Sequence, residues 1–391
     1  MAGVEKPYRV YRGGRTKGRV PLERRAERQA RGNGRAPVKP KISRPRRRWS
    51  WKKRIVVTLL ALIVFVVVWS VAGFLSFRSG VQAANKRLPT GVRAALVKQS
   101  GLILDKPTTI LLLGLDHANN DQRVTDFHSD SIMLLRTDPG HHRLTYLSIP
   151  RDLRVAIPGH GEQKINAAFQ YGGAALAIRT IEGLTGHTLD VNHVMVVDFA
   201  TFKQLIDAVG GIDINVPERI LSNPFDCPYS ARRCETWKGW RFSKGRQHMD
   251  GRRAEIYSRI RENQLNASDS DITRGERQQA VIRAVEAKLL GFGTWFKLPF
   301  RGGDYLKSLT TDLSAWQFVQ LGWVLKRAPA SKALHCRLGG VGDPNGTSDI
   351  IGGPENVGVI GMVTGQSAPQ PPPPGSGQFG PGCVIGRSTF K

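Results

Sequence analysis

The feature that most constrains this chain is an uncharged apolar run from Ile55 to Phe77. Its 23 residues, IVVTLLALIVFVVVWSVAGFLSF, include no Asp, Glu, Lys or Arg. About 20 apolar residues suffice for a helix to cross a bilayer, because each residue advances the helix by about 1.5 Å and the hydrocarbon core is about 30 Å thick. We therefore predict a transmembrane helix over residues 55–77.

A cleaved signal peptide is the competing interpretation of this run. Signal peptides have an apolar stretch of about 7–15 residues behind a short basic lead. Here the lead is 54 residues long and the run is longer, which favours an uncleaved anchor. Basic flanks stay in the cytoplasm, so we expect a single-pass protein of the cell membrane with its N-terminus cytoplasmic and everything after Arg78 outside.

The segment before the helix carries most of the chain's charge. The whole chain has a net charge of +27, and residues 1–54 hold 20 Lys and Arg against 3 Glu, a net charge of +17. Rich in Arg, Gly and Pro, this arm is predicted to be disordered. Its basic residues suit membrane orientation and anionic lipid headgroups. Nucleic-acid binding is the alternative, but no recognition module accompanies the arm, so no nucleic-acid partner is expected.

All four cysteines follow the apolar run, on the side where disulfides persist. They are Cys227, Cys234, Cys336 and Cys383. Sequence alone permits three pairings. We expect the bridges Cys227–Cys234 and Cys336–Cys383, the second tying down the C-terminal tail.

The exported part is expected to consist of a helical stalk (78–106), a domain (107–365) and a Pro/Gly-rich tail (366–391). Apolar runs that alternate with helical patterns favour an α/β domain, a central mixed β-sheet flanked by helices as an α/β/α sandwich. Strands are predicted at 108–116, 130–138, 143–150, 193–199 and 212–217 and near Leu334. Helices are predicted at 164–171, 174–184, 201–211, 252–261, 273–290 and 312–327 and near Asn356.

An arginine cluster stands out within this domain. Arg259, Arg261, Arg274 and Arg277 fall within 19 residues. The guanidinium fork binds phosphate oxygens in pairs, so the cluster predicts a polyanionic ligand. Arg274, Arg277 and Gln278 share one helix face near its N-terminus, which also favours anions. Arg259 and Arg261 are two residues apart, so both reach one ligand only from an extended segment or a helix end.

Three further charged residues follow predicted strands. Asp116 ends the first strand, Asp130 begins the second, and Arg151 follows the third. Ligands bind at strand ends in α/β sheets, and two carboxylates beside arginines suit a divalent cation that neutralises phosphate. The alternatives are that the aspartates are turn or cap residues and that Arg151 forms a surface ion pair with Asp152 or Asp138.

Seven motifs occur in an order that resembles the LytR-CpsA-Psr family of bacterial envelope proteins, over roughly Thr108 to Leu290. They are LLLGLD, the SD of HSDS, SIPRD, KINAAFQYGG, the VDF…IDAVGGIDINVP run, YSRIR, and the D-x-x-R-x-x-RQQ of 271–279. Seven motifs in order behind one membrane helix make the match specific.

The resemblance implies a phosphotransferase that attaches glycopolymers carried on polyprenyl pyrophosphate, of teichoic acid, capsule or arabinogalactan type, to peptidoglycan, with an accessory pyrophosphatase activity as a further option. It implies Mg²⁺ or Mn²⁺ on Asp116 and Asp130, which with Arg151 form the catalytic set. By the same resemblance, pyrophosphate would be bound by Arg151, Arg259, Arg261 and Arg274, supported by Arg277 and Gln278. The lipid tail would lie in an apolar tunnel, for which 280–290 and 199–209 are candidate walls.

The chain departs from the family pattern at two positions. Ala118 and His128 stand where the family usually has arginines, and Arg123 in the intervening loop is a candidate replacement. His128 is either a titratable partner or a solvent-exposed loop residue. These departures keep open the hypothesis of a non-catalytic scaffold that binds polyprenyl phosphate. The resemblance leaves a third hypothesis, an envelope-linked transcriptional attenuator, because members of the family have been labelled so.

Overall fold

The computed structural model describes residues 8–9, 20–21, 50–116, 128–266, 271–376 and 379–386. The chain divides into two units, Met1–Leu60 and Ala61–Lys391. In the first unit, strands β1 (Tyr8–Arg9) and β2 (Val20–Pro21) pair antiparallel. Residues 51–54, which were predicted to belong to a disordered arm over residues 1–54, are instead part of helix α1 (Trp51–Lys86). The rest of the arm lies almost entirely outside the described residues.

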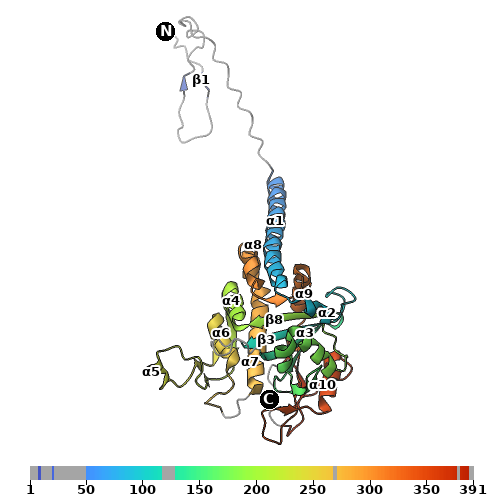
Figure 1. Ribbon diagram of the computed structural model, residues 1–391. Coiled ribbons are helices and arrows are strands. Elements are labelled where there is room, and N and C mark those ends of the chain that lie inside the picture. Colours follow the sequence, from blue (N-terminus) through green and yellow to red (C-terminus); the bar gives the residue numbers. More distant parts are fainter. Residues whose placement is uncertain are drawn as a thin grey trace, which may run out of the picture. The chain divides into compact units, whose positions relative to one another are not determined.

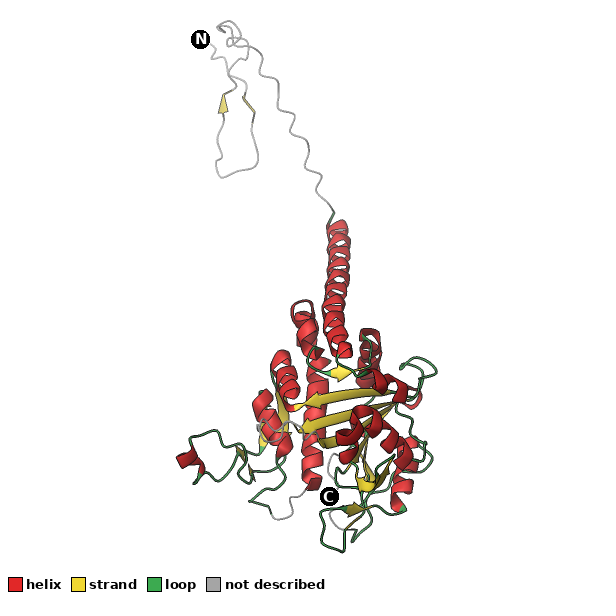
Figure 2. Cartoon of the chain, viewed as in Figure 1, coloured by secondary structure: helices red, strands yellow, loops and turns green. Residues whose placement is uncertain are grey.

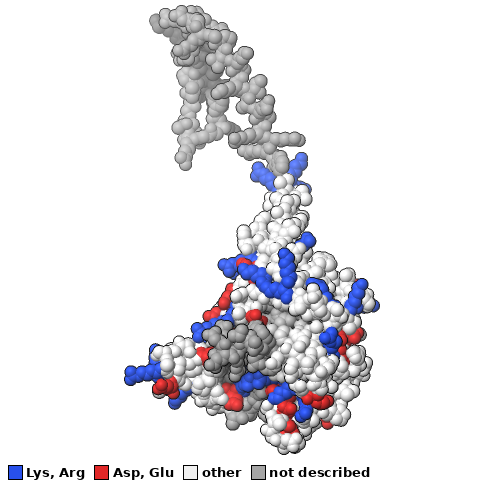
Figure 3. All heavy atoms as spheres, viewed as in Figure 1, with Lys and Arg blue, Asp and Glu red and all other residues white. Residues whose placement is uncertain are grey.

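Helix α1 (Trp51–Lys86) contains the whole apolar run (Figures 1 and 2). By length and composition it can cross a membrane, and in Figure 3 its surface is uncharged over most of its length. The helix is longer than the predicted 55–77 because no proline interrupts the sequence between Trp51 and Leu88. Its last turns, with Val81 and Ala84, are buried in the second unit.

A seven-stranded mixed sheet forms the centre of the second unit. Its strands are β3 (Thr108–Asp116), β4 (His128–Asp138), β5 (Arg143–Ile149), β8 (His193–Asp198), β13 (Thr310–Thr311), β14 (Leu334–Arg337) and β17 (Gly382–Ile385). They lie in the order β13-β8-β3-β4-β5-β14-β17. β8 pairs parallel with β3 and β14 pairs parallel with β5, whereas the other pairs are antiparallel. The predicted mixed α/β sheet is confirmed.

Helices lie on both faces of this sheet (Figure 1). They are α2 (Thr90–Ala95), α3 (Ala167–Leu184), α4 (Phe199–Val209), α5 (Ala231–Cys234), α6 (Gly251–Arg259), α7 (Asp271–Leu289), α8 (Phe292–Leu306), α9 (Ala315–Arg327) and α10 (Glu355–Thr364), with the 3-10 turns η1 (Pro139–His141) and η2 (Ala330–Lys332). The α/β/α arrangement follows from the strands: alternate side chains leave from opposite faces, so a strand that is apolar throughout needs cover on both sides.

The two faces of the sheet belong to different cores. Leu111 and Leu134 pack with Ile178 of α3, whereas Ile110 and Met133, one residue away along their strands, belong to the cluster that contains α9. This alternation is the period of two expected of a strand. The chain therefore builds a sandwich from strands whose sequence is almost continuously apolar.

Two helix predictions differ from the structure for reasons of backbone conformation. The predicted helices 164–171 and 174–184 form one element, α3, whose backbone leaves the helical region at Gly172 and Gly173; Gly173 has φ of +58°, which glycine adopts without strain. Helix α8 was not predicted, because glycines and Pro299 within it disfavour a helix.

Within the described part of the second unit, four two-stranded sheets lie outside the central sheet. They are β6 (Arg154–Ile157) with β7 (Gly161–Lys164), β9 (Ile212–Val216) with β12 (Gly245–Met249), β10 (Ile220–Leu221) with β11 (Arg241–Phe242), and β15 (Val341–Gly342) with β16 (Ile350–Ile351). The strand predicted at 212–217 therefore exists as β9, but its partner is β12. Its alternate residues Ile212, Ile214 and Val216 are buried.

The segments expected to be a stalk and a tail are both tied into the folded unit. In the expected stalk, Leu88, Val92 and Ile103 are buried. At the other end, β17 adds an antiparallel strand to β14, and a disulfide joins Cys336 to Cys383 across this pair. The second disulfide joins Cys227 to Cys234. The pairs are those favoured by the sequence.

We predict that the two disulfides differ in their contribution to stability. Residues 336 and 383 are 47 apart, whereas 227 and 234 are 7 apart. In the loop-entropy model, removal of the longer crosslink costs about 4 kcal/mol and of the shorter one about 2.5 kcal/mol. Denaturant unfolding of the Cys336→Ala/Cys383→Ala and Cys227→Ala/Cys234→Ala double variants checks this. An equal or larger loss in the second variant would contradict it.

Candidate functional site

A large apolar cavity lies between the sheet and the helices of one face. Its volume is about 880 Å³. Strands β3, β4 and β8 line it on one side, and α1, α4, α7, α8 and α9 line it on the others. Both segments expected to wall a tunnel contribute, with Phe202 and Leu205 from 199–209 and Val281 and Val285 from 280–290.

A smaller polar pocket of about 340 Å³ contains three of the predicted arginines. Arg259, Arg261 and Arg274 line it, together with Gln278 and the segment Ser222–Phe225. We call it the arginine pocket. Three guanidinium groups at one pocket favour an anion with several phosphate oxygens.

The arginine pocket and the apolar cavity are continuous. Gly114, Ser131, Ser258 and Gln278 line both. The Ser131 hydroxyl donates to Gln278 Oε1 over 2.9 Å, which links β4 to α7 at this junction. A molecule with an anionic head and a long apolar tail therefore matches the combined site.

The end of helix α6 explains how two arginines that are two residues apart reach one pocket. Asp250 caps the helix by accepting from the Arg253 backbone N–H over 2.7 Å. The helix ends at Arg259, and Ile260 is extended and buried. Arg259 is held by Glu255 at 3.0 Å and by Asp226, whereas Arg261 is exposed. Of the two arrangements that the spacing allowed, an extended segment or a helix end, the structure has the helix end.

Helix α7 separates the roles of its two arginines. Arg274 and Gln278, one turn apart, face the arginine pocket. Arg277 is buried and donates to the Ile260 carbonyl over 2.7 Å. This contact fastens the end of α6 to α7, and Arg277, expected to support the pyrophosphate site, is not among the described residues that line the arginine pocket.

The two predicted metal-binding aspartates lie at the ends of neighbouring strands. Asp116 ends β3 opposite His128, and Asp130 falls at a bulge in β4, between Ser129, which pairs with Leu115, and Ser131, which pairs with Gly114. Their side chains, and that of His128, lie outside the described part of the chain, as does the loop 117–127 with Ala118 and Arg123. The backbone therefore brings both aspartates to the Gly114 and Ser131 end of the arginine pocket.

The carboxylate groups of Asp116 and Asp130 are of the chemical type that binds a divalent cation. Carboxylate oxygens are the ligands that Mg²⁺ and Mn²⁺ accept, with water and phosphate oxygens completing the set. Both aspartates lie within two residues of a pocket-lining residue. Among the described side chains there is no cluster of three or more His, Cys, Asp or Glu, so a cation at this end would depend on the two aspartates and the bound phosphate.

Arg151 follows β5 and forms an ion pair with Asp152, with 3.3 Å between Nε and Oδ2. Asp152 also accepts from Lys164 Nζ over 3.0 Å. Arg151 is not among the described residues that line the arginine pocket. Its described contact is the ion pair that the sequence offered as the alternative.

A buried polar group in the cavity wall was missed by the sequence analysis. Glu286 of α7 lines the apolar cavity and accepts from the Tyr146 hydroxyl over 3.0 Å. Burial raises the pKa of Glu286 to about 7. Nearby, the pKa of His335 is lowered to about 4, mainly by burial and to a smaller extent by the positive charge of Arg283. His335 stacks on Tyr146, with ring centroids 5.1 Å apart. Glu286 lies within a predicted helix, so only tertiary contacts reveal it.

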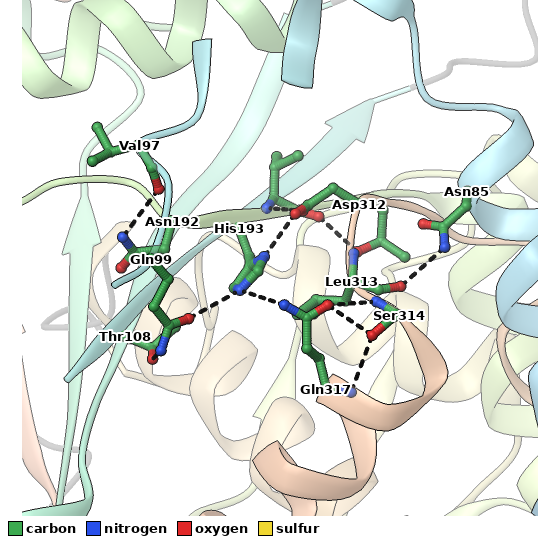
Figure 4. A network of polar contacts seen from close by, with 12 residues as sticks. Asn85, Val97, Gln99, Thr108, Asn192, His193, Asp312, Leu313, Ser314 and Gln317 are labelled. Carbon is green, nitrogen blue, oxygen red and sulfur yellow. Dashed lines mark hydrogen bonds and ion pairs between the residues drawn. The ribbon is translucent and has the colours of Figure 1, made fainter. Parts of the chain in front are cut away.

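A second polar network holds the cavity helices in place (Figure 4). His193 Nδ1 of β8 lies 2.6 Å from Asp312, whose other oxygen accepts from the Val194 N–H over 2.8 Å. The Leu313 carbonyl accepts from Asn85 of α1 over 3.1 Å. The segment before α9 is therefore fixed to both the sheet and α1.

Comparison with models of protein families shows how this chain is related to known proteins. The model of the LytR_cpsA_psr family matches residues 74–351. The chain belongs to the LytR-CpsA-Psr family. The match includes every described residue of the arginine pocket and of α8, and it confirms the relationship indicated by the seven motifs.

Several family members resemble the chain over part of their length. Polyisoprenyl-teichoic acid–peptidoglycan teichoic acid transferase TagU is 33% identical over 190 residues in Enterococcus faecalis, covering 48% of this chain and 56% of the relative, and 28% identical over 279 residues in Bacillus mycoides, covering 69% and 83%. Regulatory protein MsrR of Staphylococcus aureus is 29% identical over 252 residues, covering 63% and 68%. The chain thus spans little more than half of the first of these relatives.

Solved family structures share the fold. Bacillus subtilis TagV has a TM-score of 0.54 and 26% identity, covering 67% of this chain and 97% of that one. The TagT structure with bound octaprenyl pyrophosphate lipid has a TM-score of 0.50 and 22% identity, covering 71% and 97%. The LytR-CpsA-Psr fold therefore accounts for most of the second unit.

Replacing Glu286 should alter how stability depends on pH. With a folded pKa of about 7 and an unfolded value near 4.5, Glu286 holds its proton more tightly in the folded state. Its contribution to stability is therefore complete below about pH 4.5 and is lost as pH rises to about 7. Between pH 5 and pH 8 the wild type should lose on the order of 1–3 kcal/mol more than Glu286→Gln.

The measurement is denaturant unfolding at both pH values. His335 titrates in the opposite sense, because its lowered pKa makes stability fall as pH drops below about 6.5, so only the difference between wild type and variant is informative. The exposed Glu235→Gln serves as the matched control. Equal slopes in wild type and Glu286→Gln would contradict the assignment.

Proposed function

We propose that this protein is a phosphotransferase that attaches glycopolymers carried on polyprenyl pyrophosphate to cell-wall peptidoglycan. The observation that carries the proposal is the junction of the apolar cavity with the arginine pocket at Gly114, Ser131, Ser258 and Gln278. Few biological molecules combine a long hydrocarbon chain with a polyanionic head, and polyprenyl pyrophosphates do.

The arginine pocket suits the pyrophosphate. Arg259, Arg261 and Arg274 line it from two elements, the end of α6 and the first turns of α7. Pairs of parallel N–H donors from each guanidinium match phosphate oxygens in geometry as well as in charge. The first turns of α7 also present the positive end of the helix dipole.

The apolar cavity suits the polyprenyl chain. Its walls are almost entirely aliphatic and aromatic, and a volume of about 880 Å³ is at the upper end of ordinary ligand sites. Each buried CH₂ group of a bound chain contributes about 0.8 kcal/mol. Such a cavity selects a ligand by the length and apolarity of its hydrocarbon chain. Binding of the ligand's head group in the arginine pocket then sets the position of the reacting phosphorus.

The reaction then requires little chemistry from side chains beyond charge neutralisation and positioning. A hydroxyl oxygen of the acceptor forms a bond to the phosphorus that carries the glycan, the bond from that phosphorus to the bridging oxygen breaks, and polyprenyl phosphate leaves. Arg259, Arg261 and Arg274 stabilise the charge that develops on the leaving phosphate. The acceptor proton passes to a carboxylate, Asp116 or Asp130.

Asp116 and Asp130 are also the residues that would hold Mg²⁺ or Mn²⁺. When bound there, the cation would supply charge neutralisation on the phosphate oxygens. The transferase names of the TagU relatives support the proposed transfer activity. Two further activities stay within the proposal: pyrophosphate hydrolysis in the absence of acceptor, and regulation of the kind named for MsrR.

We further propose a single-pass topology. The basic residues before α1 keep the N-terminus in the cytoplasm, which places the part of the chain after the apolar run outside. The two disulfides in this part of the chain agree with an oxidising compartment. This side of the membrane is also where the peptidoglycan acceptor lies.

Removing single arginines from the pocket tests the function. Arg261→Ala and Arg274→Ala should each lower turnover of a polyprenyl-pyrophosphate glycan with a peptidoglycan acceptor by about 10- to 1000-fold, because each removes donors from the developing charge. Radiolabelled transfer in vesicles measures it. Arg246→Ala is the matched control, since Arg246 is exposed and pairs with Asp213 away from both sites.

Turnover unchanged in both pocket variants would remove the assigned site. Lipid that copurifies with the wild type and not with the variants, without any product, would instead identify a polyprenyl-phosphate-binding scaffold.

Dependence on a metal forms a separate prediction. Chelation should abolish turnover and Mg²⁺ or Mn²⁺ should restore it. Asp130→Asn should raise the Mg²⁺ concentration needed for half-maximal rate by about 10- to 100-fold, as loss of a ligand or its support does elsewhere. The exposed Asp105→Asn is the control. Full activity of Asp130→Asn at limiting Mg²⁺ would exclude this residue as a ligand.

A further inference from the structure

Helix α8 lies beside the part of α1 that belongs to the apolar run. Trp69 of α1 contacts the rings of Phe296 and Phe300, at centroid distances of 5.0 and 5.5 Å. A β-carbon added at Gly73 would lie 3.0 Å from Leu298. Figure 1 shows α8 alongside the end of α1 that enters the folded unit.

Small residues bring the two helices into close contact. A β-carbon at Gly80 would lie 2.3 Å from the Gly303 carbonyl oxygen, and one at Gly302 would lie 2.9 Å from the backbone nitrogen of Phe77. The Ser76 hydroxyl accepts from the Gly303 N–H over 3.2 Å. Close packing through glycines with a polar contact across the interface is typical of helices that associate in membranes.

The level of this contact follows from helix geometry. Phe77 ends the uncharged run, and Trp69 precedes it by eight residues, or about 12 Å along the helix. If the bilayer ended at Trp69, only residues 55–68 would remain inside it, about 21 Å of helix, which is too short for a hydrocarbon core of about 30 Å. The bilayer must therefore extend past Trp69, to the level of Phe296 and Phe300.

The outward face of α8 has the composition that such a position requires. Phe292, Phe296 and Phe300 recur every fourth residue on one face and are 77%, 49% and 76% exposed. None of the three is among the described residues that line the apolar cavity, so the cavity does not account for them. Lys297 and Arg301 are exposed on the remaining surface of the helix. An apolar face beside long cationic side chains is typical of helices at a membrane interface.

Helix α9 completes this end of the molecule. Trp316, Val319 and Trp323 lie on one face of α9, are exposed, and also line the apolar cavity. Phe318 of the same helix contacts Phe77 of α1. Residues that are exposed and line a cavity mark its opening, so the apolar cavity opens between α1, α8 and α9.

We propose that α8 is embedded in the membrane leaflet next to the folded unit, alongside α1, and that the apolar cavity opens within that leaflet. A polyprenyl chain would then enter sideways from the lipid without crossing water, while the arginine pocket at the far end of the cavity stays in the aqueous phase. This inference rests on the proposed anchoring by α1. A bilayer is the occupant because α1 itself must lie in lipid at this level.

Fluorescence quenching in vesicles tests the inference on the full-length chain. All four native cysteines are in disulfides, so single cysteines introduced by Phe292→Cys and Phe300→Cys can be labelled with an environment-sensitive dye. Val64→Cys, 60% exposed in the middle of the apolar run, is the embedded reference. Val357→Cys, 71% exposed on α10, is the aqueous reference.

We expect brominated phospholipid to quench the labels at 292 and 300 within about twofold of the label at 64, and iodide to quench only the label at 357. Iodide quenching at 292 and 300 with protection at 64 would overturn the embedding of α8 and leave α1 as a membrane helix. Protection of 292 and 300 from both quenchers would show a protein partner, such as a second copy, and also overturn it. Iodide quenching at 64 would instead refute the anchoring in the proposed function.

Discussion

The structure is organised around an apolar cavity that its own side chains do not fill. On one side of the sheet, α3 packs directly on the strands; on the other, the helices leave an apolar cavity of about 880 Å³. Side chains around such a space lack the dispersion contacts of a filled core, and water gains little there because it finds few polar partners. An apolar occupant therefore stabilises the folded unit as it binds.

The two ends of this cavity lie in different surroundings, and that contrast orients a ligand. At one end the walls give way to Arg259, Arg261 and Arg274; at the other they give way to exposed aromatic residues of α8 and α9. A charged head is favoured at the first end, whereas hydrocarbon is favoured along the cavity and at the second end, because burying an unpaired charge is costly. The contact of α8 with α1 through glycines then couples the site to the helix that is suited to cross a membrane.

Much of the fold could be predicted from the sequence. The central strands are short apolar runs bounded by turns, and β3 has the predicted limits Thr108 and Asp116. The spacing of Arg259 and Arg261 allowed either an extended segment or a helix end, and α6 ends at Arg259. The partner of β9 and helix α8 were not predicted, because strand pairing is a long-range choice and the glycines and Pro299 of α8 disfavour a helix that tertiary packing nevertheless stabilises.

By itself, the sequence determined the apolar helix, the mixed α/β class and the kinds of group at the site, since these depend on local composition and periodicity. Only the tertiary structure decided that Arg277 is buried against Ile260 while Arg274 lines the pocket. It alone placed Glu286 in the cavity wall and α8 beside α1. These outcomes depend on which surfaces come into contact when segments far apart in the sequence pack together. Local sequence patterns do not predict such contacts.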